Sequence, residues 1–368
     1  MTAHRQRTHR GVIVNQTLID TLKRVGKTPH VYVSPDGSEV LVLPHGGRVL
    51  GLFVPQAAEN LFWTHPALDA PATAAEFYAG DQWQNSGGDR TWLAPEVDFF
   101  FPNYPDTSVY FQPRQLDPGA WRVTVEAEAV RLVCRLTHQL SRSGASVDLE
   151  LTKSVSAAPN PLRHEPLWAE LAEVQYAGYT LRSSLALSSD PSLGPVGLWN
   201  LIQMPHGGDL LVATYCASQP RVYFGEVSAE DLVVGPHLIR YAMRAAGEHK
   251  SGIRAVAASG RIGYRYPRAD GRCVLIVRNI FVNPSGEYVD VPWGDPQDFG
   301  YAIQACNVHS GLGRFSELEY HVPAIGRGTG RSRGEDASQT WAYCGPAAAI
   351  DQIVGHLLTA GAEASETR

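Results

Sequence analysis

Alternation of apolar and polar residues, at the period of a β-strand, is the feature that most constrains this fold. In residues 131–136 apolar side chains occupy every second position, and the pattern returns in 147–151 after a polar turn at 141–145. Successive side chains of a strand point to opposite faces, so the pattern predicts two half-buried strands joined as a hairpin. On the polar faces we expect arginines opposite carboxylates, at about 0.2–1 kcal/mol per pair.

Short apolar runs of this kind recur along the chain, separated by clusters of Gly, Pro, Asn and Asp. They lie at 40–42, 49–54, 179–187, 210–214, 222–224 and 274–281. Helical periodicity appears only at 17–25 and, after Pro346, at 350–358. Parallel strands would need crossover helices that this pattern lacks. We therefore predict an all-β fold, a large antiparallel β-sandwich forming one domain over 30–358, with a polar lead-in and short helix at 1–29 and a tail at 359–368.

Composition and net charge indicate which kinds of molecule the protein could bind. Apolar residues make up 44% and charged residues 18% of the 368 positions, with 35 glycines and 25 prolines, which is typical of a turn-rich globular protein. The net charge is −6 and no basic stripe is present, which argues against nucleic acid or an anionic membrane as the main partner. A small neutral ligand fits this balance better. The sequence does not set the oligomeric state.

Cysteine spacing and the N-terminus bear on the compartment. The five cysteines are scattered without C-x-x-C spacing, and we interpret them as reduced residues of the core. The basic stretch 1–10 is not followed by an apolar run long enough for a signal peptide, and no later stretch reaches membrane-spanning length. We expect a cytoplasmic protein.

The stretch 315–324 is the first candidate for chemistry. Read as a strand, it places Glu317, Glu319 and His321 on one face and apolar side chains on the other. Same-face neighbours stand about 6.5–7 Å apart, near enough for two carboxylates and an imidazole to shift one another's pKa. The alternative is a solvated face whose charges serve solubility alone. A metal site built from these residues would be unusual, because strand spacing by itself rarely suffices, so we expect no metal and no other cofactor.

The second candidate is the stretch 80–96, which places amides, charges and two tryptophans between glycines. Indole faces cover the C–H side of a pyranose, while Asp, Asn, Gln and Arg supply directional hydrogen bonds to its hydroxyl groups. The alternative is a long loop in which the polar groups satisfy the backbone and the indoles only pack. The residues proposed to bind a saccharide here are Trp83, Asp89, Arg90, Trp92 and Glu96.

Four segments, at 46–53, 60–63, 87–96 and 317–319, resemble in that order the uncharacterised bacterial proteins of the galactose mutarotase-like superfamily. The resemblance spans roughly residues 30 to 358. It implies a large antiparallel β-supersandwich whose concave face binds carbohydrate. Aldose 1-epimerases of the superfamily use a late-strand glutamate as base and histidines as acid. The strand with Glu317 and Glu319 looks like the position of that glutamate, and either residue could correspond to it.

One part of the superfamily's pattern is missing. The epimerase motif, Asn-His followed by an aromatic-rich strand, is replaced by 197–203, which ends in Gln203. The proton donor must then come from elsewhere. The candidates are His206, His164 and His309, of which His309 is expected in a loop overhanging the site. Gln203 and His321 complete the residues proposed to bind the substrate.

Three functions follow from these features. The first is a carbohydrate-binding protein that also acts at the anomeric centre, an isomerase of aldose 1-epimerase type, with Glu317 or Glu319 as base and a histidine as acid. The second is a non-catalytic sugar-binding protein, which the missing histidine motif favours. The third is a carbohydrate lyase or hydrolase, which would require an acid positioned beside a carboxylate.

Overall fold

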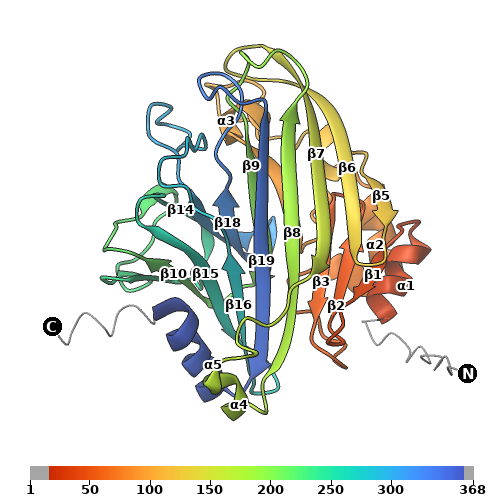
Figure 1. Cartoon of the computed structure of the whole chain (residues 1–368). Helices are drawn as coiled ribbons and strands as arrows, with labels where there is room; N and C mark the ends of the chain where they lie inside the picture. The colour runs from red at the N-terminus through yellow and green to blue at the C-terminus, as the bar shows by residue number, and fades with distance from the viewer. Residues whose placement is uncertain (1–15, 360–368) are drawn as a thin grey trace, which may run out of the picture.

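Two antiparallel sheets lie face to face in the computed structural model, which describes residues 16–359 (Figure 1). The nine-stranded sheet runs in the order β1 (His30–Val33), β2 (Glu39–Leu43), β3 (Arg48–Phe53), β4 (Asp89–Ala94), β9 (Gly197–Pro205), β18 (Gly313–His321), β17 (Ile303–Ser310), β14 (Gly247–Ile253) and β11 (Arg221–Phe224). The ten-stranded sheet runs in the order β12 (Leu232–Val234), β13 (Leu238–Ala242), β10 (Asp209–Thr214), β15 (Ala258–Pro267), β16 (Cys273–Asn279), β19 (Arg333–Gly345), β8 (Gln175–Leu187), β7 (Ser146–Ala157), β6 (Ala129–Gln139) and β5 (Arg122–Val125). The predicted antiparallel β-sandwich is confirmed.

The predicted hairpin consists of β6 and β7, and Arg135 lies opposite Glu150 and forms an ion pair with it. The main core lies between the sheets because each strand directs alternate side chains inward. On β18 the inward residues are Leu318 and Tyr320, both fully buried. Glu317 and Glu319 therefore lie on the other face of the nine-stranded sheet, which we call the outer face.

Helices cover the outer faces of the two sheets in part. α1 (Gln16–Arg24) packs against β2 and β3 together with α2 (Pro71–Ala79) and the 3-10 helix η1 (Pro66–Asp69). α5 (Ala347–Val354) and the π-helical turn η3 (Gly355–Thr359) cover β16 and β19 on the ten-stranded sheet. Pro346 is the N-cap of α5. The remaining helical segments are short: α3 (Glu96–Phe99), η2 (Gln115–Gly119) and α4 (Pro166–Glu170).

Three sequence-based expectations need correction or fall outside the described residues. Residues 89–94 are not part of a long loop but form β4, because they pair with β9 in the middle of the nine-stranded sheet. Cys216 is exposed, whereas the other cysteines are buried. Most of the predicted lead-in, at 1–15, and nearly all of the tail, at 360–368, lie outside the described residues.

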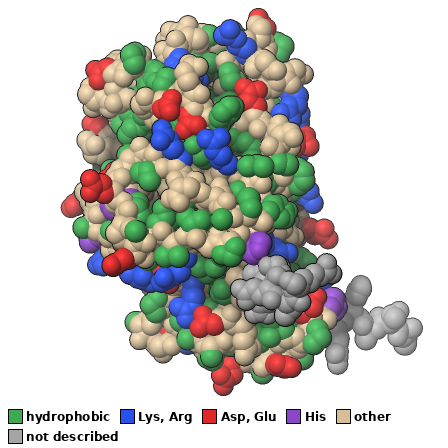
Figure 2. Space-filling view, turned by 90° about the vertical axis from the view of Figure 1, so that its left-hand side faces the viewer, with side chains coloured by type: hydrophobic (Ala, Val, Ile, Leu, Met, Phe, Trp, Pro, Cys, Tyr) green, Lys and Arg blue, Asp and Glu red, His purple; other side chains and the backbone are tan. Residues whose placement is uncertain are grey.

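Between residues 16 and 359, no helix combines the length and the apolar character needed to cross a membrane. On the face drawn in Figure 2, acidic, basic and apolar side chains are interspersed.

Candidate active site

Strand register gathers polar side chains from opposite ends of the sequence on the outer face of the nine-stranded sheet. Residues directly opposite each other in antiparallel strands point to the same side, so each row across the sheet can be read from the pairing. One row is Lys250, Cys306, Glu317 and Gln203. The next is Gln304, Glu319, Leu201 and Arg90, and the third is His321, Trp199 and Trp92. Two carboxylates, two cations and two indoles thus share one surface.

A cavity of about 600 Å³ lies over these rows. Loops and strand ends raise its walls, which are mainly aromatic: Trp83, Tyr110, Trp199, Phe224, Trp293 and Phe315. The charged and thiol groups that line it are Arg90, Glu96, Glu248, Lys250, Cys306 and Glu317. Its volume lies in the range of about 300–1,000 Å³ that small-molecule sites occupy.

The indole N–H groups around this cavity are all tied to carboxylates. Asp117 on η2 accepts from Nε1 of Trp83 at 3.0 Å and from Nε1 of Trp92 at 3.1 Å. Nε1 of Trp199 donates to Glu319 at 2.7 Å, and Nε1 of Trp293 donates to Glu96 at 2.8 Å. The polar edges of these rings are thereby occupied, and the walls offer ring faces.

Trp92 lines the cavity and supports Arg90. Its side chain is only 3% exposed, and the guanidinium of Arg90 lies 4.0 Å from its ring centre and 5.0 Å from that of Trp83. Arg90 in turn donates through Nη2 to Oε1 of Glu317 at 3.0 Å. Trp92 therefore holds Arg90 in place beneath the cavity, while Trp83 is the more accessible of the two indoles.

Glu317 presents one free oxygen to the cavity. Its Oε1 accepts from Arg90 and, at 3.0 Å, from Nε2 of Gln203. Its Oε2 has no hydrogen-bond partner within residues 16–359. Because Glu317 lines the cavity, this oxygen is an acceptor available to a ligand.

Glu319 lies behind Glu317 and does not line the cavity. Its carboxyl is fully buried, accepts from Trp199 and lies 3.5 Å from Nζ of Lys250. Burial raises the pKa of Glu319 to about 8; the charge of Lys250 opposes this shift and that of Glu317 adds to it.

Lys250 connects several carboxylates at the floor of the cavity. Its Nζ lies 3.4 Å from Glu96, 3.5 Å from Glu319 and 3.9 Å from Asp290, and 4.2 Å from the ring centre of Trp199. Burial alone would lower the pKa of Lys250, but attraction to the three carboxylates outweighs it and raises the pKa. The lysine remains charged at any pH at which the protein would work.

The histidines singled out from the sequence do not line the cavity. His321 is buried and stacked on Trp199, and burial, followed by the charge of Lys250, lowers its pKa well below the usual value, so it is neutral. The rings of His206 and His309 lie 5.0 Å apart beside the ends of β9 and β17. His309 belongs to β17, where it pairs with Gly247 and Arg314, and not to an overhanging loop. His164 is exposed on the connection between β7 and α4.

Asp89 also lies outside the cavity. It precedes Arg90 on β4, so its side chain points inward between the sheets. There it accepts from the hydroxyl of Tyr179 at 2.6 Å and pairs with Arg278 at 3.1 Å. Its surroundings assign it to the interior, where it joins the two sheets. Glu96, by contrast, lines the cavity at the start of α3 and accepts hydrogen bonds from Tyr110 and Trp293.

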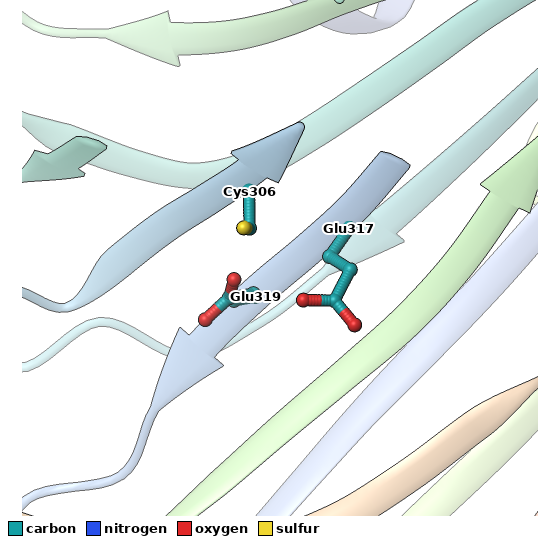
Figure 3. Close-up of side chains that lie close together, drawn as sticks. All are labelled: Cys306, Glu317 and Glu319. Atoms are coloured by element: carbon teal, nitrogen blue, oxygen red, sulfur yellow. The ribbon is translucent and has the colours of Figure 1, made fainter. Parts of the chain in front are cut away.

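Cys306, Glu317 and Glu319 are the one group of possible metal ligands that the part of the chain from 16 to 359 brings together, with one ligand atom from each within 4.8 Å of the others (Figure 3). Figure 3 shows the thiol and both carboxylates on the same side of two neighbouring strands. The carboxylates already have cationic partners, Arg90 for Glu317 and Lys250 for Glu319. Burial and the two glutamates raise the pKa of the Cys306 thiol well above its usual value, so the donor set fits a metal ion poorly.

Sequence reasoning missed several residues of this site. Lys250 and Glu248 lie two positions apart on β14, and that pair of charges on one strand was a usable signal. Cys306 was interpreted as an ordinary core residue, yet it lines the cavity. His65 also lines the cavity, with Nδ1 accepting from the backbone N–H of Ala67 and with Phe77 stacked on its ring. Trp293 lies in an irregular segment and gave no pattern to read.

Comparisons with known proteins come from solved structures and from curated sequences. The chain is similar to a galactose mutarotase-related enzyme from Lactobacillus acidophilus, at 9% identity and a TM-score of 0.47, with 85% of this chain and 97% of that chain covered. It is also similar to an aldose epimerase homologue from C. elegans, at 10% identity and a TM-score of 0.42, with coverage of 87% and 100%. The third similar structure is a galactose 1-epimerase from Lactobacillus acidophilus NCFM, at 9% identity and a TM-score of 0.41, with 87% of this chain and 95% of that chain covered. A comparison with curated proteins finds no match.

At these identities the likeness to solved structures concerns the fold alone. The sequence resemblance was to an uncharacterised family, and the family comparison agrees with that. A model described as a family of unknown function (DUF6786) matches residues 72–366, most of the length of the chain, and the chain therefore belongs to that family.

Proposed function

We propose that the protein binds a saccharide in the aromatic-walled cavity on the outer face of the nine-stranded sheet. The observation that carries this proposal is the combination of ring faces, whose N–H edges are turned to carboxylates, with one free carboxylate oxygen on Glu317. A pyranose has a C–H face that packs on an aromatic ring and hydroxyl groups that donate to a carboxylate. The cavity offers both kinds of contact side by side.

The experiment is a binding survey of monosaccharides and disaccharides by saturation-transfer NMR and calorimetry. Wild type and Trp293→Ala are compared, because Trp293 lines the cavity and is half-buried. The matched control is Trp168→Ala, which removes an indole on α4, beneath the ten-stranded sheet. Saturable binding that Trp293→Ala weakens and Trp168→Ala leaves unchanged supports the proposal. An absence of binding for every saccharide would reject it.

A second candidate is turnover at the anomeric centre, favoured by the free Oε2 of Glu317. In that reaction Glu317 takes the proton of the anomeric hydroxyl, the bond from the anomeric carbon to the ring oxygen breaks, and the ring oxygen receives a proton from an acid. The open-chain sugar then closes on either face of its carbonyl group. Glu319 cannot be the base in contact with substrate, because it is fully buried behind Glu317.

The catalytic candidate lacks a well-suited proton donor for the ring oxygen. Among the described residues that line the cavity, Lys250 and His65 carry N–H groups suited to the task. The pKa of Lys250 is raised by its carboxylate neighbours, which makes it a reluctant acid. Nδ1 of His65 already accepts a hydrogen bond and burial lowers the pKa of the ring, so His65 can donate a hydrogen bond but holds no extra proton at neutral pH. These features favour binding over turnover.

The lyase or hydrolase alternative has less support. Glycosidases place two carboxyl groups on either side of the scissile bond. Here Glu319 does not reach the cavity, and the carboxylate of Glu96 is engaged by Tyr110, Trp293 and Lys250. Among the described residues, Glu317 and, at the rim, Glu248 are the cavity carboxylates that keep an oxygen without a hydrogen-bond partner.

A further inference from the structure

We infer that the cavity selects its saccharide by charge: it takes amino sugars in preference to neutral ones and rejects uronates and sugar phosphates. This inference rests on the proposed function and names the substrate class for it. It rests on which charged groups at the cavity already have hydrogen-bond or ion-pair partners and which can still accept or donate a hydrogen bond.

Arg90, the first of the two cations that line the cavity, has no N–H group available to an anionic ligand. Its Nη2 donates to Glu317, and its guanidinium lies 5.0 Å from the ring centre of Trp83 and 4.0 Å from that of Trp92. Nε and Nη1 have no partner, but both atoms are fully buried and cannot meet a ligand. An anionic sugar could reach this guanidinium only by displacing Glu317.

Lys250, the second cation, already has three acidic side chains close to its ammonium group. Three carboxylates, of Glu96, Glu319 and Asp290, lie within 3.9 Å of its Nζ. A carboxylate or phosphate of a ligand would have to compete with these fixed partners in a region of low dielectric, where like charges repel strongly. The lysine therefore neutralises the protein's own acids and does not attract an acidic ligand.

The charged groups of the cavity that can still bind a ligand are carboxylates. Three carboxylates line it, on Glu96, Glu248 and Glu317, against the two cations. Oε2 of Glu317 has no partner among the described residues, and Glu248 is half-buried, with the hydroxyl of Ser310 donating to its Oε1. The lining therefore carries more negative than positive groups, which favours ligands with a positive charge.

An ammonium group satisfies this arrangement better than a hydroxyl does. Hydrogen bonds between a cation and a carboxylate are roughly twice as strong as neutral ones. The aromatic walls of Trp293 and Phe224 add ring faces that attract cations. We therefore expect the amine of an amino sugar to lie against Oε2 of Glu317.

The test is a matched series of ligands measured by calorimetry at about pH 6.5, where the amine of an amino sugar is charged. Glucose, glucosamine and glucuronate are compared, together with the corresponding galactose series. We expect the better-fitting amino sugar to bind about fivefold or more tightly than its neutral parent and the uronate to bind at least about tenfold more weakly. Both differences should shrink as salt is added.

Variants link the selectivity to this cavity. Glu248→Gln removes one rim charge and should narrow the gap between amino sugar and uronate, whereas Glu335→Gln makes the same change at an exposed site on β19 and should leave it unchanged. A uronate that binds as tightly as its neutral parent, while neutral sugars still bind, overturns the charge inference and leaves the proposed function standing. If none of the sugars binds, the proposed function fails and this inference fails with it.

Discussion

Arg90 on β4 and Glu317 on β18 form a 3.0 Å ion pair across β9, although 227 positions separate them in the chain. Both side chains are almost completely buried. Removal of one partner from a buried pair leaves a charge without compensation, at a cost of about 3–5 kcal/mol. Each residue therefore depends on the other, and both belong to the floor of the cavity.

We expect Arg90→Met to lower the free energy of unfolding by about 3–5 kcal/mol, because Glu317 is left with Gln203 as its neutral partner. The double variant Arg90→Met/Glu317→Gln should recover much of that loss. Urea denaturation of wild type, both single variants and the double variant measures the coupling. Additive losses would show that the two residues do not stabilise each other.

Trp92 and Trp293 should respond differently to truncation. Trp92 is 3% exposed, so Trp92→Ala is expected to cost about 3–5 kcal/mol of stability through the void it leaves. Trp293→Ala should instead weaken saccharide binding by about 1–3 kcal/mol, with a smaller change in stability. Melting temperatures and calorimetric affinities of the two variants separate the roles. A normal affinity in Trp293→Ala would place its ring outside the ligand contact.

Glu319 makes stability depend on pH between about 4.5 and 8. Its pKa is about 8 in the folded protein and near 4.5 in a free chain, so the folded state binds the extra proton between these values. Its contribution is complete below about pH 4.5 and is lost as the pH rises through about 8. We expect unfolding free energies across this window to fall less in Glu319→Gln than in wild type. The exposed Glu230→Gln, as control, should keep the wild-type slope.

Lys153 gives the opposite dependence in the alkaline range. It is buried on β7, donates to the carbonyl oxygen of Gly47 at 2.7 Å, and burial lowers its pKa to about 8. The unfolded chain therefore binds more protons between about pH 8 and 10.5, and stability rises with pH there. Lys153→Met should stabilise the protein by about 1–3 kcal/mol at pH 7 and lose that advantage near pH 10.5. A destabilised variant at pH 7 would show that the bond to Gly47 outweighs the buried charge.

Glu317→Gln decides between a binder and an enzyme. The amide keeps the shape of the side chain but cannot accept a proton, so any anomer interconversion should be abolished while binding stays within about tenfold. Polarimetry and NMR of freshly dissolved aldoses, from about pH 5 to 9, measure the rate. If wild type never exceeds the buffer rate on a sugar that it binds, the catalytic candidate is excluded and Glu317 acts as a hydroxyl or ammonium acceptor.

Alternation along the chain was enough to predict the sandwich and to place Glu317 and Glu319 on one face, because strand parity is a local property. The same parity separates Asp89 from Arg90 once residues 89–94 are recognised as a strand. Lys250 could not be joined to Glu319 in this way, because their contact depends on the order β18, β17, β14 in the sheet. The histidines could not be assigned from the sequence either, because residue type and spacing do not reveal that His65 lines the cavity and His309 does not.

Three buried carboxylates, of Asp117, Glu96 and Glu319, hold the four indoles by their N–H edges from behind the walls. A tethered ring has little freedom to change rotamer, so we expect the cavity to keep its shape when a ligand binds. The loss of side-chain entropy on binding then falls mainly on the ligand, and affinity is expected to be sensitive to the rigidity of the sugar ring more than to any closing motion of the protein.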